Sequence, residues 1–141
     1  MTPTDSFALE GHVGFLLRKA HQRHVAIFVE ATASHGLTPT QFAALQKLAE
    51  VGSATQNLLG RLVAMDPATI QGVVRRLTER GLIARTHDPM DKRTAVLKPT
   101  EEGLALARAS VACAQRAHDA ALSALSPEER AVFLSLLRKM G

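Results

Sequence analysis

Three pairs of a capping residue and a proline mark where helices of this chain begin. Thr38-Pro39, Asp66-Pro67 and Ser126-Pro127 each place a side-chain acceptor directly before a proline. Gln41 and Glu129 complete capping boxes at the first and third of these pairs. Proline suits the first position of a helix because the amide hydrogen that it lacks has no partner there. The chain is therefore predicted to fold from several helices with defined starts.

The spacing of apolar residues predicts how far these helices extend. A long helix is expected over residues 7–34, with Gly36 as its stop. The helix that opens at Asp66 ends at Gly81, and its buried stripe consists of Ile70, Val73, Val74 and Leu77. Ser53 or Thr55 caps a short helix before it. The remaining helices are expected over residues 38–52, over residues 100–125 with Thr100 as the cap, and from residue 126 onward.

After Gly81 the period changes from helical to alternating, which is typical of strands. Residues 82–87 and 94–97 are predicted as two short strands, and the intervening residues 88–93 are rich in turn formers. The result is a β-hairpin with Lys92 and Arg93 at its tip. Two short helices followed by such a hairpin have the order of a winged helix-turn-helix. We therefore expect a mainly α fold with a small β-hairpin wing.

The excess positive charge of the chain lies in this same middle segment. The 141 residues include 17 Lys and Arg against 13 Asp and Glu, a net charge of +4. Between Arg61 and Lys98 there are eight basic and four acidic residues, which leaves nine of each elsewhere. A basic segment of this kind favours a polyanionic partner. The chain has no Tyr or Trp on which single-stranded bases would stack, so double-stranded DNA is the expected partner.

The polar face of the helix that opens at Asp66 supplies the first candidate DNA contacts. The major groove of B-form DNA admits one helix, whose outward side chains meet the base edges. Gln71 can pair bidentately with adenine, and the small Gly72 permits close approach. Basic residues farther along are expected on phosphates, on guanine or in the neighbouring minor groove. The predicted DNA contacts are Thr69, Gln71, Gly72, Arg75, Arg76, Arg85, Lys92 and Arg93.

Three stretches after this helix form a specific pattern: Arg80-Gly81-Leu82-Ile83, Asp88-Pro89-Met90-Asp91-Lys92-Arg93 and Leu97-Lys98-Pro99-Thr100-Glu101-Glu102-Gly103. Together they resemble the MarR family of bacterial transcriptional regulators, in which a long first helix and two long closing helices also occur. The chain departs from the commoner family pattern at Pro99, at Gln71-Gly72 and at Lys92, where many relatives have arginine. Lysine keeps the charge but loses the planar fork of arginine.

The resemblance implies one domain over residues 1–141 that forms a homodimer. Residues 7–35 and 101–141 would be the dimerisation helices, and residues 38–100 the winged DNA-binding part. A dimer places two recognition helices about one DNA turn apart on a pseudo-palindromic operator. The resemblance also implies a ligand cleft between the two parts. Packing of the terminal helices within one monomer stays an open alternative.

The first helix is the candidate ligand site, because four of the six histidines lie in it or just after it. A histidine that titrates near neutrality can bind an organic anion, alone or with an arginine. Residues 15–24 also resemble the first helix of family members that control the breakdown of aromatic acids. That resemblance implies a small aromatic carboxylate as effector, such as a hydroxylated nicotinate or a cinnamate-type compound. The predicted ligand-binding residues are His12, Arg18 and His21.

Other chemistries receive less support from the sequence. The histidines lack the spacing of a zinc motif, although a metal-responsive regulator stays an alternative. No cofactor is expected, and the absence of a Ser/His/Asp order, a P-loop or a dinucleotide fingerprint argues against an enzyme. Cys113, the single cysteine, is predicted to be buried and inert. Without a membrane span or a signal peptide, a cytoplasmic location is expected.

The leading hypothesis from the sequence is a homodimeric repressor that leaves its operator when a small aromatic acid binds. The alternative is an architectural protein that binds DNA without sensing a ligand. Such a protein would bind unrelated duplexes almost equally well, because its affinity would come mainly from the phosphate backbone.

Overall fold

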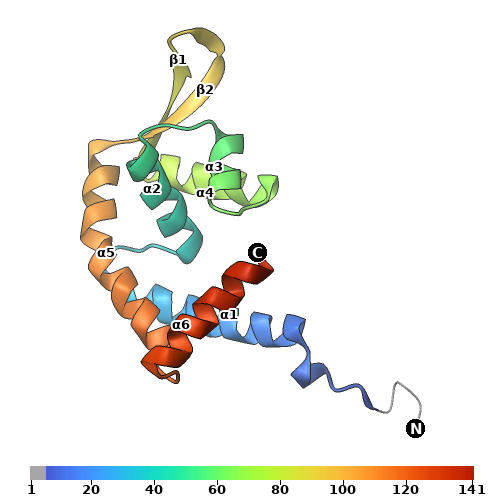
Figure 1. Cartoon of the computed structure of the whole chain (residues 1–141). Coiled ribbons are helices and arrows are strands. Elements are labelled where there is room, and N and C mark those ends of the chain that lie inside the picture. Colours follow the sequence, from blue (N-terminus) through green and yellow to red (C-terminus); the bar gives the residue numbers. More distant parts are fainter. Residues whose placement is uncertain (1–5) are drawn as a thin grey trace.

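Figure 1 shows the computed structural model, which describes residues 6–141 of the chain. The hairpin projects from one end of an elongated molecule, the first and last helices lie at the other end, and one long helix runs between them. The predicted fold class, mainly α with a small hairpin, is confirmed. The elements are η2 (Leu9–Gly11), α1 (Val13–Ala31), α2 (Pro39–Val51), α3 (Gln56–Leu62), α4 (Pro67–Glu79), β1 (Ile83–Asp88), β2 (Asp91–Pro99), α5 (Glu101–Ala121) and α6 (Pro127–Met140).

Polar side chains cap the helices α2 to α6 at the predicted positions. The Gln41 amide donates to Thr38 Oγ1 (3.2 Å) and the Thr38 amide donates to the Gln41 side chain (3.4 Å), which is the reciprocal pair of a capping box. Ser126 opens α6 with a second box. Of the two alternatives for α3, Thr55 is the cap. These hydrogen bonds fix the helix starts locally, which explains why the sequence predicts them.

The first helix is shorter than predicted. It begins at Val13 rather than at residue 7, because the backbone at His12 is extended (φ −89°, ψ 144°) and interrupts the helix. His12 Nδ1 lies 2.9 Å from the Ala8 carbonyl oxygen, and its ring centroid lies 4.0 Å from that of Phe7. These contacts fix the His12 side chain against the segment that precedes α1. Gly36 adopts a φ of 63°, a conformation that favours glycine, and ends the turn after α1.

The hairpin differs from the prediction in the length of its second strand. β1 and β2 pair antiparallel, with an irregular register after His87. Lys92 and Arg93 belong to β2, whereas the sequence placed them in the turn. The Asp91 carboxylate supports this arrangement, because it accepts hydrogen bonds from the Arg93 amide (3.0 Å) and the Thr94 hydroxyl (3.2 Å) in its own strand. The turn is therefore tighter than its composition indicates.

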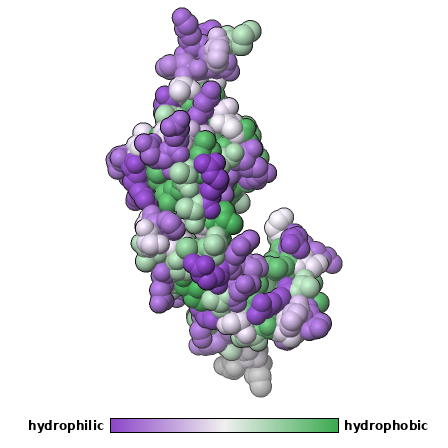
Figure 2. Space-filling view, turned by 90° about the vertical axis from the view of Figure 1, so that its left-hand side faces the viewer, coloured by the Kyte–Doolittle hydropathy of each residue, from purple (hydrophilic) through white to green (hydrophobic). Residues whose placement is uncertain are grey.

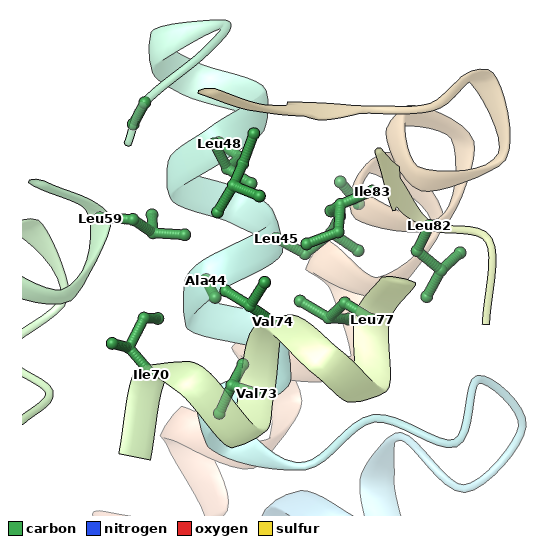
Figure 3. Packing of buried hydrophobic residues seen from close by; sticks show 13 residues of the cluster. Ala44, Leu45, Leu48, Leu59, Ile70, Val73, Val74, Leu77, Leu82 and Ile83 are labelled. Carbon is green, nitrogen blue, oxygen red and sulfur yellow. The ribbon is translucent and has the colours of Figure 1, made fainter. Parts of the chain in front are cut away.

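Two clusters of buried side chains lie along the molecule. The larger one joins α2, α3, α4, the hairpin and the start of α5, and Figure 3 shows the apolar side of α4 facing α2 within it. The predicted stripe of α4 is buried in this cluster, which confirms the prediction: Ile70, Val73, Val74 and Leu77. The smaller cluster consists of Phe28, Leu37 and Ala117. The winged part thus has its own core, and α1 packs separately on α5.

The start of α5 packs directly on the loop that leads into the hairpin. The Thr100 amide donates to the Leu82 carbonyl oxygen (3.0 Å), and its hydroxyl donates to the Gly81 carbonyl oxygen (2.6 Å). Gly103 follows in the first turn of α5, and a Cβ atom at this position would overlap the Leu82 carbonyl oxygen. The absence of a side chain at Gly103 therefore permits the close approach of α5 to the winged part.

The terminal helices leave a large apolar surface uncovered. α6 contains no buried residue, and its Leu136 is 53% exposed. Side chains of α1 lie opposite α6 across a groove of about 230 Å³. The exposed apolar residues of this groove form what we call the terminal apolar face: Val13, Leu16, Leu17, Phe133, Leu136 and Met140. A contiguous patch of this kind marks an interaction site. Within residues 6–141, no helix has the length and hydropathy needed to cross a membrane.

Candidate DNA interface and ligand cleft

The face of α4 opposite the buried stripe carries most of the predicted DNA contacts. The exposed residues on this face are Thr69, Gln71, Arg75 and Arg76. Gly72, which lies between them in the sequence, is half-buried. The helix is capped by Asp66, whose carboxylate accepts hydrogen bonds from the Thr69 amide (2.8 Å) and hydroxyl (2.9 Å). These bonds, the amide bond foremost, hold the pKa of Asp66 below its usual value. The cap therefore fixes the first turn of α4, and Gln71 follows in the second turn.

A polar hollow of about 530 Å³ lies between α4, the start of α3 and β1. Across it, Arg85 Nη2 donates to the side-chain oxygen of Gln56 at 3.3 Å. The hollow brings together three predicted contacts: Gln71, Arg75 and Arg85. The carboxylate of Glu79 also lines the hollow, beside two guanidinium groups and two side-chain amides. The guanidinium groups are the donors that suit a DNA phosphate. The sequence reasoning missed Gln56, and its one local signal was its place directly after the helix cap Thr55.

The basic residues near the tip of the hairpin form a second group. Lys92 and Arg93 are exposed on β2, and the Arg93 side chain is 97% accessible. Its Nε atom lies 3.7 Å from the Asp91 carboxylate, an exposed ion pair near the tip. In Figure 1 the hairpin extends beyond α3 and α4, and in Figure 2 its end carries mainly hydrophilic side chains. The predicted DNA contacts thus fall into two groups: one on α4 together with Arg85 of β1, and one on β2 near the tip of the hairpin.

A cleft of about 450 Å³ lies where α1, α2 and α5 meet. Its apolar wall includes Phe28 and Phe42, whose rings pack edge to face with their centroids 5.2 Å apart. The polar side chains that line it are His24, Gln115 and His118. A mostly apolar cleft of a few hundred cubic ångströms with a small number of polar groups is the usual form of a small-molecule site.

The pKa of one imidazole in the cleft, that of His24, departs from its usual value. Burial lowers the pKa of His24, and the neighbouring His21 and His118 lower it further. The His24 ring is therefore mostly neutral at neutral pH and offers one donor and one acceptor. A bound carboxylate would favour the protonated ring and so raise its pKa, and it would receive a charge-assisted hydrogen bond in return.

The residues predicted to bind the ligand do not line this cleft in the described chain. His12 and Arg18 lie at or near the start of α1. His21 lies in the middle of α1, with its ring centroid 6.4 Å from that of His24. Their role in ligand binding stays a prediction. The sequence reasoning missed His24 and His118 as a pair, because they lie on helices that are far apart in the chain.

Between residues 6 and 141, no three His, Cys, Asp or Glu side chains are arranged to hold a metal ion. Cys113 is buried, as predicted, and Arg116 Nη2 lies 3.1 Å from its sulfur. Among the described residues, the candidate functional sites are therefore the DNA interface and the cleft.

Known proteins are similar to this chain in sequence and in fold. The model of the MarR family matches residues 37–95. The HTH-type transcriptional repressor NicR of Pseudomonas putida is 42% identical over 128 residues, which are 91% of this chain and 81% of NicR. A crystal structure of a probable transcriptional regulator from Pseudomonas aeruginosa superposes with a TM-score of 0.91 at 45% identity, over 95% of this chain and 100% of that chain.

A further solved structure is similar over nearly the whole chain. It is that of Bordetella bronchiseptica BpsR, whose DNA binding is regulated by 6-hydroxynicotinic acid. It superposes with a TM-score of 0.88 at 38% identity, over 95% of this chain and 96% of that chain. These similarities confirm the predicted winged helix-turn-helix fold, and the named relatives regulate transcription rather than catalyse reactions. The chain therefore belongs to the MarR family of transcriptional regulators.

Proposed function

We propose that the protein is a homodimeric repressor that binds a pseudo-palindromic operator and is released from it by a small aromatic carboxylate. The observation that carries the sensing part is the cleft between α1, α2 and α5, where His24 and His118 stand in an otherwise largely apolar wall. As a regulator of transcription, the protein would act in the cytoplasm, where bacterial DNA lies.

The DNA-binding part of the proposal rests on the exposed face of α4. The buried stripe orients this helix, so that Gln71 faces outward one turn after the cap and the arginines follow it. We assign base reading to Gln71, with Thr69 and Gly72 beside it. Phosphate contacts are assigned to Arg75, Arg76 and Arg85. Lys92 and Arg93 on the hairpin would enter the neighbouring minor groove, whose negative potential attracts cations.

The homodimer is supported by the terminal apolar face. Apolar side chains on α1 and α6 stay exposed in one chain, and a second copy would cover them symmetrically. Such a dimer would present two α4 helices to successive major grooves. The dimer would also explain why the chain has terminal helices outside the core of the winged part, because these helices would join the two copies.

The nature of the ligand is supported by the chemistry of the cleft and by the relatives. BpsR responds to 6-hydroxynicotinic acid, and NicR is named a transcriptional repressor. A ligand shifts an equilibrium only by as much as its affinity differs between the two states. The cleft wall comes from three helices, so we infer that a ligand in the cleft changes how α1 and α5 pack against α2. The ligand would bind better to the arrangement that does not fit the operator, and the released state would then be favoured.

The DNA part is tested by replacing the exposed cation of the hairpin. Arg93→Ala is expected to weaken binding to a duplex selected by the wild-type protein, because one phosphate or minor-groove contact is lost. The slope of the logarithm of affinity against the logarithm of salt concentration should fall by about 1. Fluorescence anisotropy at several salt concentrations measures both quantities. An unchanged affinity and slope would remove the hairpin from the interface.

The sensing part is tested with 6-hydroxynicotinic acid and a panel of benzoates and cinnamates. One of these acids should release the wild-type protein from its selected duplex, and His118→Ala should raise the concentration needed by roughly tenfold, the value of one charge-assisted hydrogen bond. His21→Ala tests the site that the sequence predicted. A protein that no acid releases, and that binds unrelated duplexes equally well, would be the architectural alternative.

A further inference from the structure

Arg80 joins two parts of the fold that are otherwise far apart in the chain. It lies directly after α4, at the C-cap position, and its guanidinium reaches the turn that follows α1. Nη1 donates to the Gly36 carbonyl oxygen (2.9 Å) and Nη2 donates to the His35 carbonyl oxygen (2.8 Å). In the part of the chain that the structure describes, no backbone amide donates to either carbonyl. The planar fork of one arginine thus serves both acceptors.

Each end of this contact belongs to an element with a role in the proposed function. On one side, Arg80 continues the recognition helix α4, whose buried stripe fixes it in the winged core. On the other side, the turn is anchored to α1 by Thr32, whose buried hydroxyl lies 2.8 Å from the carbonyl oxygens of both Phe28 and Leu37. The helix α1 carries part of the terminal apolar face. The fork of Arg80 therefore connects the recognition helix to the helix of the proposed dimer interface.

Direct packing between these two helices is slight. Their buried residues belong to different clusters, with the stripe of α4 in the larger one and Phe28 of α1 in the smaller one. The winged part and α1 are joined through α5, through the packing of Phe28 on Phe42 of α2, and through the turn that Arg80 holds. A pair of hydrogen bonds from a charged donor is strong enough to fix an orientation, although an exposed pair adds little to the free energy of folding.

We propose that Arg80 is a positioning residue for operator binding, because its two hydrogen bonds to the turn after α1 set the separation of the two recognition helices in the dimer. The inference rests on the proposed homodimer and its two-part operator. Arg80 itself acts at a distance from the bases: it fixes the angle of α4 against the dimer platform. The protein then accepts operators with one spacing between the half-sites and discriminates against others.

The test compares Arg80→Gln, which removes the charge at the C-cap of α4, with Arg76→Gln. The second variant removes the same charge within α4, at a predicted DNA contact. The probes are the duplex that the wild-type protein selects from a random library, and two derivatives with one base pair inserted or deleted between the half-sites. The wild-type protein is expected to bind the derivatives about tenfold more weakly, the usual effect of one unfavourable position in a site. Arg80→Gln should reduce this preference to about twofold, because the angle of α4 is no longer fixed. Circular dichroism checks that each variant is folded.

Two further readouts separate positioning from DNA contact. Arg80→Gln should keep the wild-type salt slope, whereas Arg76→Gln should reduce it by about 1. Arg80→Lys should give an intermediate spacing preference, because its ammonium lacks the planar fork that holds both carbonyls. A wild-type spacing preference in Arg80→Gln, or a reduced salt slope, would overturn the inference. A wild-type protein without any spacing preference would instead refute the proposed two-part operator, and the inference with it.

Discussion

Replacing Gly103 with alanine is expected to destabilise the protein by about 3 kcal/mol or more, at or beyond the upper end of overpacking effects. The added methyl group would overlap the Leu82 carbonyl oxygen, and it would also lie 3.4 Å from Leu45 Cδ1. The Leu82 oxygen cannot move away easily, because it accepts a hydrogen bond from the Thr100 amide at the start of α5. Either α5 or the loop before the hairpin has to shift. Urea unfolding followed by circular dichroism measures the loss.

A matched control for this substitution is Gly11→Ala. An added Cβ atom at Gly11 meets no atom within 4 Å, and the residue does not have a positive φ. Its unfolding midpoint should stay close to that of the wild-type protein. If Gly103→Ala unfolds at the same urea concentration as Gly11→Ala, then α5 does not start against the Leu82 carbonyl, and the fixed joint between α5 and the winged part is refuted.

The parts of the fold that follow from local chemistry are predictable from the sequence. The caps at Thr38, Asp66 and Ser126 work within one turn of the chain, so their residue types identify the helix starts. The stripe of α4 is predictable for a similar reason, because one helix face buries residues at a fixed spacing. Its opposite face follows by geometry, which is why the predicted contacts Gln71, Arg75 and Arg76 are found exposed on it.

Features that depend on distant contacts are not predictable in this way. Spacing alone extended the first helix to residue 7, whereas the extended backbone at His12 delays it to Val13. The cleft is a stronger example, because His24 and His118 lie on helices that meet only in the folded chain. The same applies to Arg80, whose hydrogen bonds reach a turn more than forty residues earlier in the sequence.

The substitution Leu136→Glu is expected to convert the protein to a monomer and to lower its affinity for a two-part operator by about 10² to 10⁴. Leu136 is 53% exposed in one chain and lies in the groove of the terminal apolar face. A second copy would cover it, and a carboxylate buried there without a partner costs several kcal/mol in each subunit. Binding of the second half-site is intramolecular only while the two winged parts are joined.

Sedimentation equilibrium measures the mass of the Leu136→Glu protein, and anisotropy measures its affinity for the full operator and for a single half-site. The variant should bind both duplexes with nearly the same low affinity. Val51→Glu is the control, because Val51 is an exposed apolar residue at the end of α2, outside the terminal helices. It should stay dimeric and keep operator binding. If Leu136→Glu also stays dimeric with wild-type affinity, the subunits meet through a surface other than the terminal apolar face.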